Sequence, residues 1–444
     1  MAILSLKKDK DLSESLINSC EIKKGAIVVG IHQSSLQEDL YKVQSDLEEL
    51  IGLLKTLGVA VSHKFIQKRI RLNASHLLGK GKLEEISQEA KNLGIKLIVI
   101  DHPLSSPQVR NIEKITDCLV LDRSAVIIDI FAKHAQTKSA KIQVEIARLE
   151  YLLPRLTGAW THFQRQAGGG VRARGMGETQ IEVDRRRARQ RLARLQKQLN
   201  QIAIDRVIQK KSRENEIKVA IVGYTNSGKT TLMSLLTKTD TTGQDELFAT
   251  LDARVRTLDP ASKPKILLSD TVGFIRNLPH SLIASFKSTL EEVVDADLLL
   301  HVVDLSHENY SSQMITTEEV LKEIGAGDIP QLFIFNKMDK IEEKFLTKII
   351  KKKYPLSICV SAFNNEDIIN LRKLIIKYFE DKFQKISIEI DSNNQTILSL
   401  IYRQCLILSI EYNDSGSVYL DLRAPLTIFD SLLKFKCKEK MYDN

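Results

Sequence analysis

The chain has 444 residues, of which 43% are hydrophobic and 27% are charged, and its formal net charge is +9. This length suits two to four domains, each with its own core. No apolar run approaches the roughly 18 residues that a membrane-spanning helix needs, and the first ten residues lack the apolar stretch of a signal peptide. We therefore expect a globular, cytoplasmic and monomeric protein without a membrane span.

The positive charge is concentrated in residues 151–213. This stretch has 15 Lys and Arg side chains against four acidic ones, so the rest of the chain is close to neutral. The five cysteines show no pair at metal-ligand spacing, and we expect them to be reduced thiols, mostly packed as small apolar side chains. The basic stretch therefore needs an explanation of its own.

Residues 1–136 are predicted to form a small N-terminal α/β domain. Its β-rich runs are 25–31, 59–66, 95–102 and 118–131, and its helical stretches are 46–58 and 82–94. Strands that alternate with helices indicate a parallel or mixed sheet. This domain shows no cluster of catalytic side chains and no phosphate loop.

Residues 137–213 are predicted to form an antiparallel helical hairpin. Apolar residues recur there at steps of three and four, which is typical of helices that pack along narrow stripes. The two stripes are Ile142, Ile146, Leu149, Leu153 and Leu156, and Ala188, Leu192, Leu195, Leu199 and Ile202. The glycine-rich stretch 157–178 between them is predicted to be the loop at the tip of the hairpin.

Residues 214–382 are predicted to form a doubly wound α/β domain with a phosphate loop. The segment "GYTNSGKT", residues 223–230, fits the pattern G-x-x-x-x-G-K-[ST], follows a β-rich run and precedes an apolar helix. Backbone N–H groups of such a loop surround phosphate oxygens at the positive end of the helix. Lys229 is expected to reach the β- and γ-phosphates, and Thr230 to ligate Mg²⁺. The expected phosphate-binding residues are Gly223, Tyr224, Thr225, Asn226, Ser227, Gly228, Lys229, Thr230 and Thr231.

Two further segments are expected to respond to the γ-phosphate. Asp270 ends a β-rich run and can hold Mg²⁺ through water, while the N–H of Gly273 can meet the γ-phosphate. We expect Thr250 to complete the Mg²⁺ shell, although five other threonines lie nearby in the sequence. The first switch segment is Phe248, Ala249, Thr250, Leu251 and Asp252, and the second is Asp270, Thr271, Val272 and Gly273.

The residues at another strand end are expected to recognise the base. The run "FIFNKMD" places Asp339 where its carboxylate can accept both N–H groups on the guanine edge, which adenine does not offer. A site built on such a bond rejects the wrong base by about 10⁴ to 10⁵, because a buried carboxylate would otherwise be left unpaired. The backbone N–H groups of Ser361 and Ala362 are expected to face guanine O6. The expected guanine-binding residues are Asn336, Lys337, Met338, Asp339, Ser361 and Ala362. These signals predict a domain that binds GTP and GDP.

Residues 383–444 are predicted to form a small C-terminal domain of strands and helices. Its β-rich runs are 385–390 and 417–424, with an apolar stretch at 396–407 between them. The sequence does not indicate what this domain binds.

Several segments together resemble the HflX family of translation-factor-class GTPases. These segments are "LLGKGKLEEI" (77–86), "GGGVRARGMGETQIEVDRRR" (168–187), "GYTNSGKTTL" (223–232), "LFATLD" (247–252) and "DTVGFIRNLPH" (270–280). The resemblance covers about residues 25–375. It implies a GTPase that uses Mg²⁺, associates with the large ribosomal subunit and splits or rescues ribosomes, especially under stress.

Three residues bear on mechanism. Phe274 stands where Ras-type enzymes have a water-positioning Gln, which the resemblance implies is normal for HflX and which predicts slow intrinsic hydrolysis. Asn226 stands where some GTPases of this class bind K⁺, so K⁺ is a second candidate cofactor. Met176 replaces the proline that is common in the family's glycine-rich loop, and we expect binding to survive this change.

The basic hairpin is predicted to contact ribosomal RNA. Glycines, arginines and nearby aromatic residues suit irregular RNA, whose splayed bases can stack. About six phosphate contacts would lower affinity by about 10³ or more between 50 and 200 mM salt. The candidate contacts are Arg172, Arg174, Arg185, Arg186, Arg187 and Arg189.

Two other functions compete with a GTP-driven ribosome factor. One is an RNA-binding assembly or regulatory module in which GTP is mainly structural. The other is an ATP-driven RNA remodeller with a second nucleotide site in the N-terminal domain, where no phosphate loop supports it.

Overall fold

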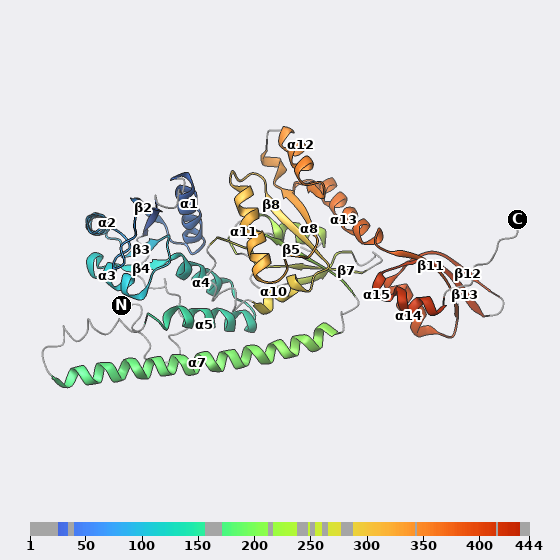
Figure 1. Ribbon diagram of the computed structural model, residues 1–444, viewed down its shortest axis with the longest axis horizontal. Coiled ribbons are helices and arrows are strands. Elements are labelled where there is room, and N and C mark those ends of the chain that lie inside the picture. The colour runs from blue at the N-terminus through green and yellow to red at the C-terminus, as the bar shows by residue number, and fades with distance from the viewer. Residues whose placement is uncertain are drawn as a thin grey trace. The chain divides into compact units, whose positions relative to one another are not determined.

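The computed structural model describes residues 25–33, 40–155, 171–211, 216–237, 247–248, 254–259, 265–276, 287–341, 344–413 and 416–435 (Figure 1). The chain divides into two compact units. The first comprises residues 1–204, 246–252 and 277–288, and the second comprises 205–245, 253–276 and 289–444. Within the described residues, no helix is long and apolar enough to cross a membrane.

The first unit contains a four-stranded parallel sheet in the order β2-β1-β3-β4, as the alternation of strands and helices predicts. Its strands are β1 (Ala26–Gln33), β2 (Val61–Arg69), β3 (Leu97–Ile100) and β4 (Leu119–Asp122). Its helices are α1 (Leu40–Thr56), α2 (Lys80–Leu93), α3 (Ser106–Thr116) and α4 (Arg123–His134). Strands β1 and β3 are buried almost throughout, because parallel sheets are covered on both faces.

The prediction of a β-rich run at 118–131 is wrong beyond its first residues. The strand β4 ends at Asp122, whose side chain accepts a hydrogen bond from the N–H of Ala125 at 3.0 Å and so caps helix α4. Every residue from Ala125 to Phe131 is buried. A helix that is buried on all sides has no polar face, so its sequence lacks the period of 3.6 and resembles a buried strand.

The predicted helical pair is α5 (Lys138–Leu152) and α7 (Val171–Lys211), which lie side by side in Figure 1. Their apolar stripes meet as predicted, and Arg191 pairs across the helices with Glu145 at 2.5 Å. Leu156 lies outside the described residues. The residues of the shared core are Ile142, Ile146, Leu149, Leu153, Ala188, Leu192, Leu195, Leu199 and Ile202.

The predicted tip loop 157–178 is wrong in its last part, because helix α7 already begins at Val171. Gly175 and Gly177 were the loop signal, since glycine costs about 1 kcal/mol relative to alanine inside a helix. In a helix of 41 residues, however, each added residue gains a backbone hydrogen bond, and the Arg residues before the two glycines, the Met between them and the Glu and Gln after them favour helix. Residues 156–170 lie outside the described residues.

The second unit contains a six-stranded sheet in the order β10-β9-β8-β5-β7-β6. It is parallel except for β6, which pairs antiparallel with β7 at the edge. Its strands are β5 (Ile217–Gly223), β6 (Arg254–Thr257), β7 (Ile266–Asp270), β8 (Leu298–Asp304), β9 (Gln331–Asn336) and β10 (Ser357–Cys359). The predicted doubly wound sheet is thereby confirmed, and the carboxyl ends of its parallel strands meet at one edge.

Helices cover this sheet. They are α8 (Lys229–Leu236), α10 (Lys287–Val294), α11 (Tyr310–Glu323), α12 (Lys344–Lys353), α13 (Asn365–Glu380) and the short 3₁₀ helix η6 (Met338–Lys340). One apolar core joins strands β5, β7, β8 and β9 to helices α8 and α13, with Val219, Leu232, Leu300 and Leu371 at most 1% exposed. This packing fixes the loops at the carboxyl ends of the strands.

The C-terminal part of the second unit is a three-stranded antiparallel sheet in the order β11-β13-β12 with two helices and a 3₁₀ turn. Its elements are β11 (Gln384–Asp391), α14 (Gln395–Gln404), β12 (Leu406–Tyr412), β13 (Ser417–Ala424), α15 (Leu426–Leu432) and η7 (Leu433–Phe435). Its own apolar core includes Ile388, Ile401 and Leu420, each fully buried.

Candidate nucleotide-binding site

The loop between β5 and α8 requires glycine at two positions. Gly223 has φ +147° and Gly228 has φ +92°, both in the region that favours glycine. A Cβ atom at Gly223 would lie 2.2 Å from the carbonyl oxygen of Val302, and one at Gly228 would lie 2.3 Å from Nδ2 of Asn336. The loop is therefore packed against the ends of β8 and β9, where no side chain fits.

Lys229 begins helix α8 and is buried. Its Nζ donates a hydrogen bond to the carbonyl oxygen of Tyr224 at 2.6 Å, within the loop itself. Burial lowers the pKa of Lys229 to about 8, with Asp270 opposing this shift and Lys337 adding to it. The ammonium thus lies inside the loop, where a phosphate oxygen would strengthen its charged form.

Thr230 and Asp270 meet at the ends of α8 and β7. The hydroxyl of Thr230 donates to Oδ2 of Asp270 at 2.8 Å, and Asp270 is fully buried. The neighbouring Thr271 is anchored by its hydroxyl, which donates to the carbonyl oxygen of Ile221 at 2.6 Å. A hydroxyl and one carboxylate side by side fit Mg²⁺, which takes one or two protein oxygens and completes its shell with phosphates and water.

The second switch segment lies directly against the phosphate loop. The N–H of Phe274 donates to the carbonyl oxygen of Gly223 at 3.1 Å, and its carbonyl oxygen accepts from the N–H of Thr225 at 2.8 Å. Tyr224 adds a third link, because its hydroxyl accepts from the N–H of Arg276 at 3.0 Å. The Phe274 side chain is 2% exposed and has no polar atom, so it cannot orient a water molecule. Val272 and Gly273 precede it, and Gly273 borders Lys229.

The loop after β9 is joined to the phosphate loop by two side chains. Nδ2 of Asn336 donates to the carbonyl oxygen of Ser227 at 2.9 Å, and Asn336 is 1% exposed. Nζ of Lys337 donates to the carbonyl oxygen of Asn226 at 2.9 Å and pairs with Asp304 at 2.7 Å. Asn226 itself is exposed, with φ +58°. These bonds fix the distance between the phosphate loop and the expected base-binding loop.

Asp339 is oriented by the loop after β10. The hydroxyl of Ser361 donates to Oδ1 of Asp339 at 2.7 Å, while the N–H of Ser361 donates to Asp367 at 2.8 Å. The expected contact of the Ser361 and Ala362 N–H groups with guanine O6 stays a prediction. Met338 is tied by its N–H to the carbonyl oxygen of Val360 at 3.3 Å. The sequence alone does not indicate that the hydroxyl of Ser361 orients Asp339.

The hydrogen bonding of two hydroxyl groups in the phosphate loop indicates a ligand site. Oγ1 of Thr225 and Oγ of Ser227 are buried, and among the described residues neither has a hydrogen-bond partner. Buried polar atoms usually have partners, so this loop suits a ligand with many acceptor oxygens. Phosphate groups meet that description.

The first switch segment is described only in part. Phe248 has φ +60°, is 3% exposed and packs edge to face against Phe131 of helix α4, with ring centroids 4.6 Å apart. Both residues belong to the first unit. The predicted Mg²⁺ ligand Thr250 lies outside the described residues, as do Ala249, Leu251 and Asp252.

His301 is a buried residue near this site that the sequence analysis missed. It lies in β8, contacts Gln331 through Nδ1 at 3.2 Å and is 1% exposed. Burial lowers the pKa of His301 to about 4, and the charge of Lys229 adds to this effect. The one available signal was a titratable residue inside the apolar run "LLLHVVD".

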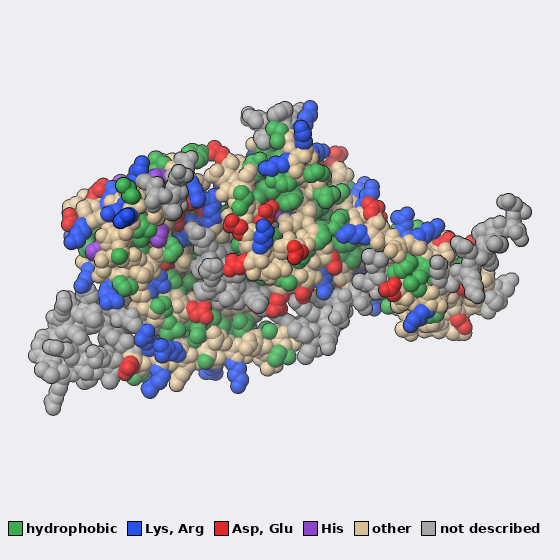
Figure 2. Space-filling view, viewed as in Figure 1, with side chains coloured by type: hydrophobic (Ala, Val, Ile, Leu, Met, Phe, Trp, Pro, Cys, Tyr) green, Lys and Arg blue, Asp and Glu red, His purple; other side chains and the backbone are tan. Residues whose placement is uncertain are grey.

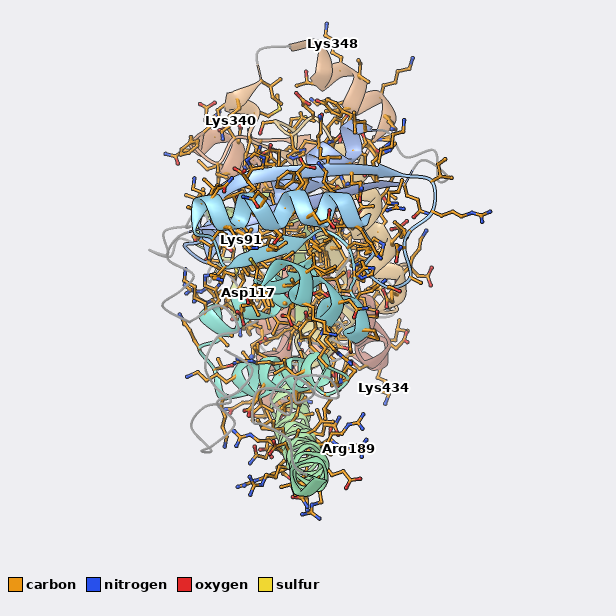
Figure 3. The ribbon with its side chains drawn as sticks, turned by 90° about the vertical axis from the view of Figure 1, so that its left-hand side faces the viewer. Lys91, Asp117, Arg189, Lys340, Lys348 and Lys434 are labelled. Carbon is orange, nitrogen blue, oxygen red and sulfur yellow. The ribbon has the colours of Figure 1, made fainter. Side chains whose placement is uncertain are left out.

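The candidate RNA contacts lie on α7. Arg186, Arg187 and Arg189 are exposed and Arg185 is partly buried, and Figure 3 labels Arg189 on this helix. The side chains of Arg172 and Arg174, in the first turn of the helix, are outside the described set. The exposed arginines lie outside the stripe that packs on α5: Arg186 is opposite it, and Arg187 and Arg189 flank it on either side.

The phosphate loop after the central strand, the carboxylate beside its threonine and the Asn336–Asp339 loop define a P-loop GTPase. Three family models cover most of the chain: "GTP-binding GTPase N-terminal" at residues 44–132, "GTP-binding GTPase Middle Region" at 134–213 and "50S ribosome-binding GTPase" at 218–337. Curated GTPases named HflX match over most of their lengths, so the chain belongs to the HflX GTPase family and hydrolyses GTP.

Two of these relatives show the extent of the match. HflX of Gluconacetobacter diazotrophicus is 38% identical over 437 residues, which cover 90% of this chain and 95% of the relative. HflX of Flavobacterium psychrophilum is 42% identical over 370 residues, covering 79% and 89%. Among solved structures, a GTP-binding protein of Sulfolobus solfataricus in complex with GDP is 26% identical, covers 80% of this chain and 98% of its own, and superposes with a TM-score of 0.41.

Proposed function

We propose that this GTPase associates with the large ribosomal subunit and splits or rescues ribosomes, especially under stress. The observation that carries the proposal is the exposed row Arg186, Arg187 and Arg189, which lies on a long helix of a chain whose GTPase domain matches the "50S ribosome-binding GTPase" model. Arginines exposed on the solvent side of a helix suit the phosphates of RNA. In this proposal the protein binds the subunit in the cytoplasm, and it does so as a monomer.

GTP is proposed to bind between the phosphate loop and the base-binding loop. Residues 223–231 hold the phosphates, Asn336 to Asp339 with Ala362 hold guanine, and Ser361 orients Asp339. Thr230, Thr250 and Asp270 through water are the proposed Mg²⁺ ligands. Bound by these residues, Mg²⁺ would supply positive charge against the phosphates of the nucleotide. Lys229 leaves its bond to Tyr224 and contacts the phosphates.

Hydrolysis is proposed to be slow in the free protein and faster on the ribosome. Phe274 offers no group to orient the attacking water, so this group comes from another residue or from the partner. GTP orders the two switch segments in this proposal, and hydrolysis releases the protein from the subunit. The regions 1–136, 137–213, 214–382 and 383–444 are proposed as the functional divisions of the chain.

The decisive experiment is sedimentation of 70S ribosomes with the full-length protein and GTP, a nonhydrolysable GTP analogue or GDP. We expect conversion to free subunits with the two triphosphates and little with GDP. Unchanged 70S particles, together with subunit binding that is equal in GDP and a flat GTPase rate, would favour the assembly or regulatory module instead. A variant with glutamine at Arg186, Arg187 and Arg189 is expected to lose subunit binding and keep its GDP affinity.

K⁺ is proposed as a second cation at Asn226, where its charge would replace an arginine finger. The exposed position of Asn226, whose side-chain amide oxygen is a ligand type that a cation accepts, supports this proposal. GTPase rates measured at equal concentrations of KCl and NaCl test it. We expect faster hydrolysis in KCl, and equal rates would remove K⁺ from the mechanism.

A further inference from the structure

The second unit has a basic surface of its own, apart from α7. It consists of Lys340, Lys348, Lys351, Lys352 and Lys353, on η6 and helix α12, and we call it the α12 surface. All five side chains are exposed, and the described residues form no ion pair with any of them. Figure 2 shows Lys and Arg side chains gathered over α12, and Figure 3 shows Lys340 and Lys348 extending outward.

Helix stability alone explains only part of this surface. Lysines in the last turn of a helix interact favourably with its macrodipole, by about 0.3–1 kcal/mol each, which accounts for Lys351 to Lys353. Lys348 lies a turn earlier, however, and faces Lys351 and Lys352 at spacings of three and four. Like charges at these spacings destabilise a helix by about 0.2–0.5 kcal/mol per pair. The segment "KFLTKIIKKK" also contains no acidic residue to offset them.

We propose that the α12 surface binds the phosphate backbone of RNA. Lys348 and Lys352 are separated by about 6 Å along the helix axis, so their ammonium groups can reach neighbouring phosphates. Lysine is a flexible point charge that contacts phosphate without reading bases, which predicts binding with little sequence preference. The surface begins at Lys340, directly after the base-binding Asp339, and so it lies on the GTPase domain itself.

An anionic membrane is the less suitable partner. A helix that lies in a membrane interface needs a free apolar face to insert among the lipids. In α12 that face is already used, because Ile350 is 2% exposed and packs in a core with Phe335 and Tyr354. Among the side chains of α12 that the structure describes, Ile349 is the one exposed apolar residue. The lysine side chains of α12 are therefore exposed to a partner, whereas its residue Ile350 is already packed in the protein core.

The α12 surface extends the proposed function with a second RNA contact and can be tested separately from it. The test variant is Lys348→Gln/Lys351→Gln/Lys352→Gln in the full-length protein. The control variant is Lys91→Gln/Lys114→Gln/Lys434→Gln, which removes the same charge from exposed lysines elsewhere, two of which are labelled in Figure 3. Binding to a 20-base-pair RNA duplex and to purified large ribosomal subunits is measured from 50 to 200 mM KCl.

For the test variant we expect duplex affinity at 100 mM KCl to fall at least about tenfold, and the slope of log K against log salt to decrease by about 2 to 3, since each lost phosphate contact contributes about 0.7–0.9. The control variant should retain both values, and GDP affinity should be unchanged in both variants. Equal losses in the two variants, or no loss in either, would overturn the proposal.

Two comparisons separate this proposal from its alternatives. If the α12 variant keeps full RNA binding but loses binding to vesicles with 30% phosphatidylserine, the partner is a membrane and the RNA assignment is wrong. If the α12 variant binds subunits normally while the Arg186, Arg187 and Arg189 variant does not, the α12 inference fails and the proposed function stands. If only the α12 variant loses subunit binding, the α12 inference stands and α7 is not the contact.

Discussion

Replacing Ser361 by alanine removes the hydroxyl group that orients the carboxylate of Asp339, the proposed base-binding residue. The Ser361 hydroxyl donates to Oδ1 of Asp339 at 2.7 Å and accepts the N–H of Phe363 at 3.3 Å. A buried hydrogen bond to a charged group contributes about 1.5–3 kcal/mol. Because Asp339 is exposed, we expect its hydrogen bond to Ser361 to contribute about 1 kcal/mol to GDP binding. That free energy corresponds to about a fivefold increase in the dissociation constant for GDP.

The assay is isothermal titration of wild type and Ser361→Ala with GDP and with inosine diphosphate, which lacks the guanine 2-amino group. Asp339 is proposed to accept two hydrogen bonds from guanine and only one from hypoxanthine. A misplaced carboxylate should therefore weaken GDP binding more than inosine diphosphate binding, and the ratio of the two affinities should fall.

The matched control is Ser357→Ala in strand β10, which precedes the loop that carries Ser361. The Ser357 hydroxyl donates to the carbonyl oxygen of Tyr354 at 2.6 Å and makes no bond to Asp339. This variant should bind both nucleotides as wild type does. Equal loss of GDP and inosine diphosphate affinity in Ser361→Ala, or a loss in Ser357→Ala of the same size, would refute the argument that Ser361 acts through the carboxylate.

Three further predictions concern the phosphate loop and the strand beneath it. Gly228→Ala should weaken GDP binding at least about tenfold in titrations, because its Cβ would displace Nδ2 of Asn336 at a position with φ +92°; affinity within twofold of wild type would contradict this. Lys229 has a pKa of about 8, so GDP binding at pH 8.5 should take up about 0.8 proton per site, against about 0.2 at pH 7.5, measured as the dependence of the binding enthalpy on buffer ionisation; equal uptake at both pH values would refute it. The pKa of His301 is lowered to about 4, so the unfolded chain takes up this proton first as pH falls below 6.5. Between pH 7 and pH 5 the wild type should therefore lose about 2 kcal/mol more of its free energy of unfolding than His301→Gln does in urea titrations; parallel losses would count against it.

The central strands β5, β7, β8 and β9 of the second unit were predictable because they are mostly buried on both faces. Their residues form largely apolar runs, and the polar residues Asp270, Asp304 and Asn336 stand at the ends of β7, β8 and β9. The motif residues at their ends follow from the same rule, since strand ends meet at one edge. Sequence spacing therefore located the candidate site before any contact was known.

Other features depended on contacts between distant residues and could not be predicted in this way. Helix α4 has no polar face, so its period is hidden, and α7 passes through glycines that usually end a helix. The bond from Ser361 to Asp339 joins side chains 22 residues apart, and two strand-end loops must first be in place. The sequence did not reveal the α12 surface because acidic residues lie close to its lysines in the sequence and lower the net charge summed over that segment.

The position of Phe248 links the predicted first switch segment to the N-terminal part of the chain. A left-handed conformation costs a residue other than glycine about 1–2 kcal/mol, and Phe248 adopts it with φ +60°. Its burial beside Phe131, which is fully buried, offsets this cost by about 1.5–3 kcal/mol. Phe248 belongs to the first compact unit, whereas the phosphate loop belongs to the second. A nucleotide that draws Phe248 away from Phe131 must therefore supply the difference between the burial free energy and the relieved backbone strain, because a ligand shifts a conformational equilibrium only by its difference in affinity for the two states.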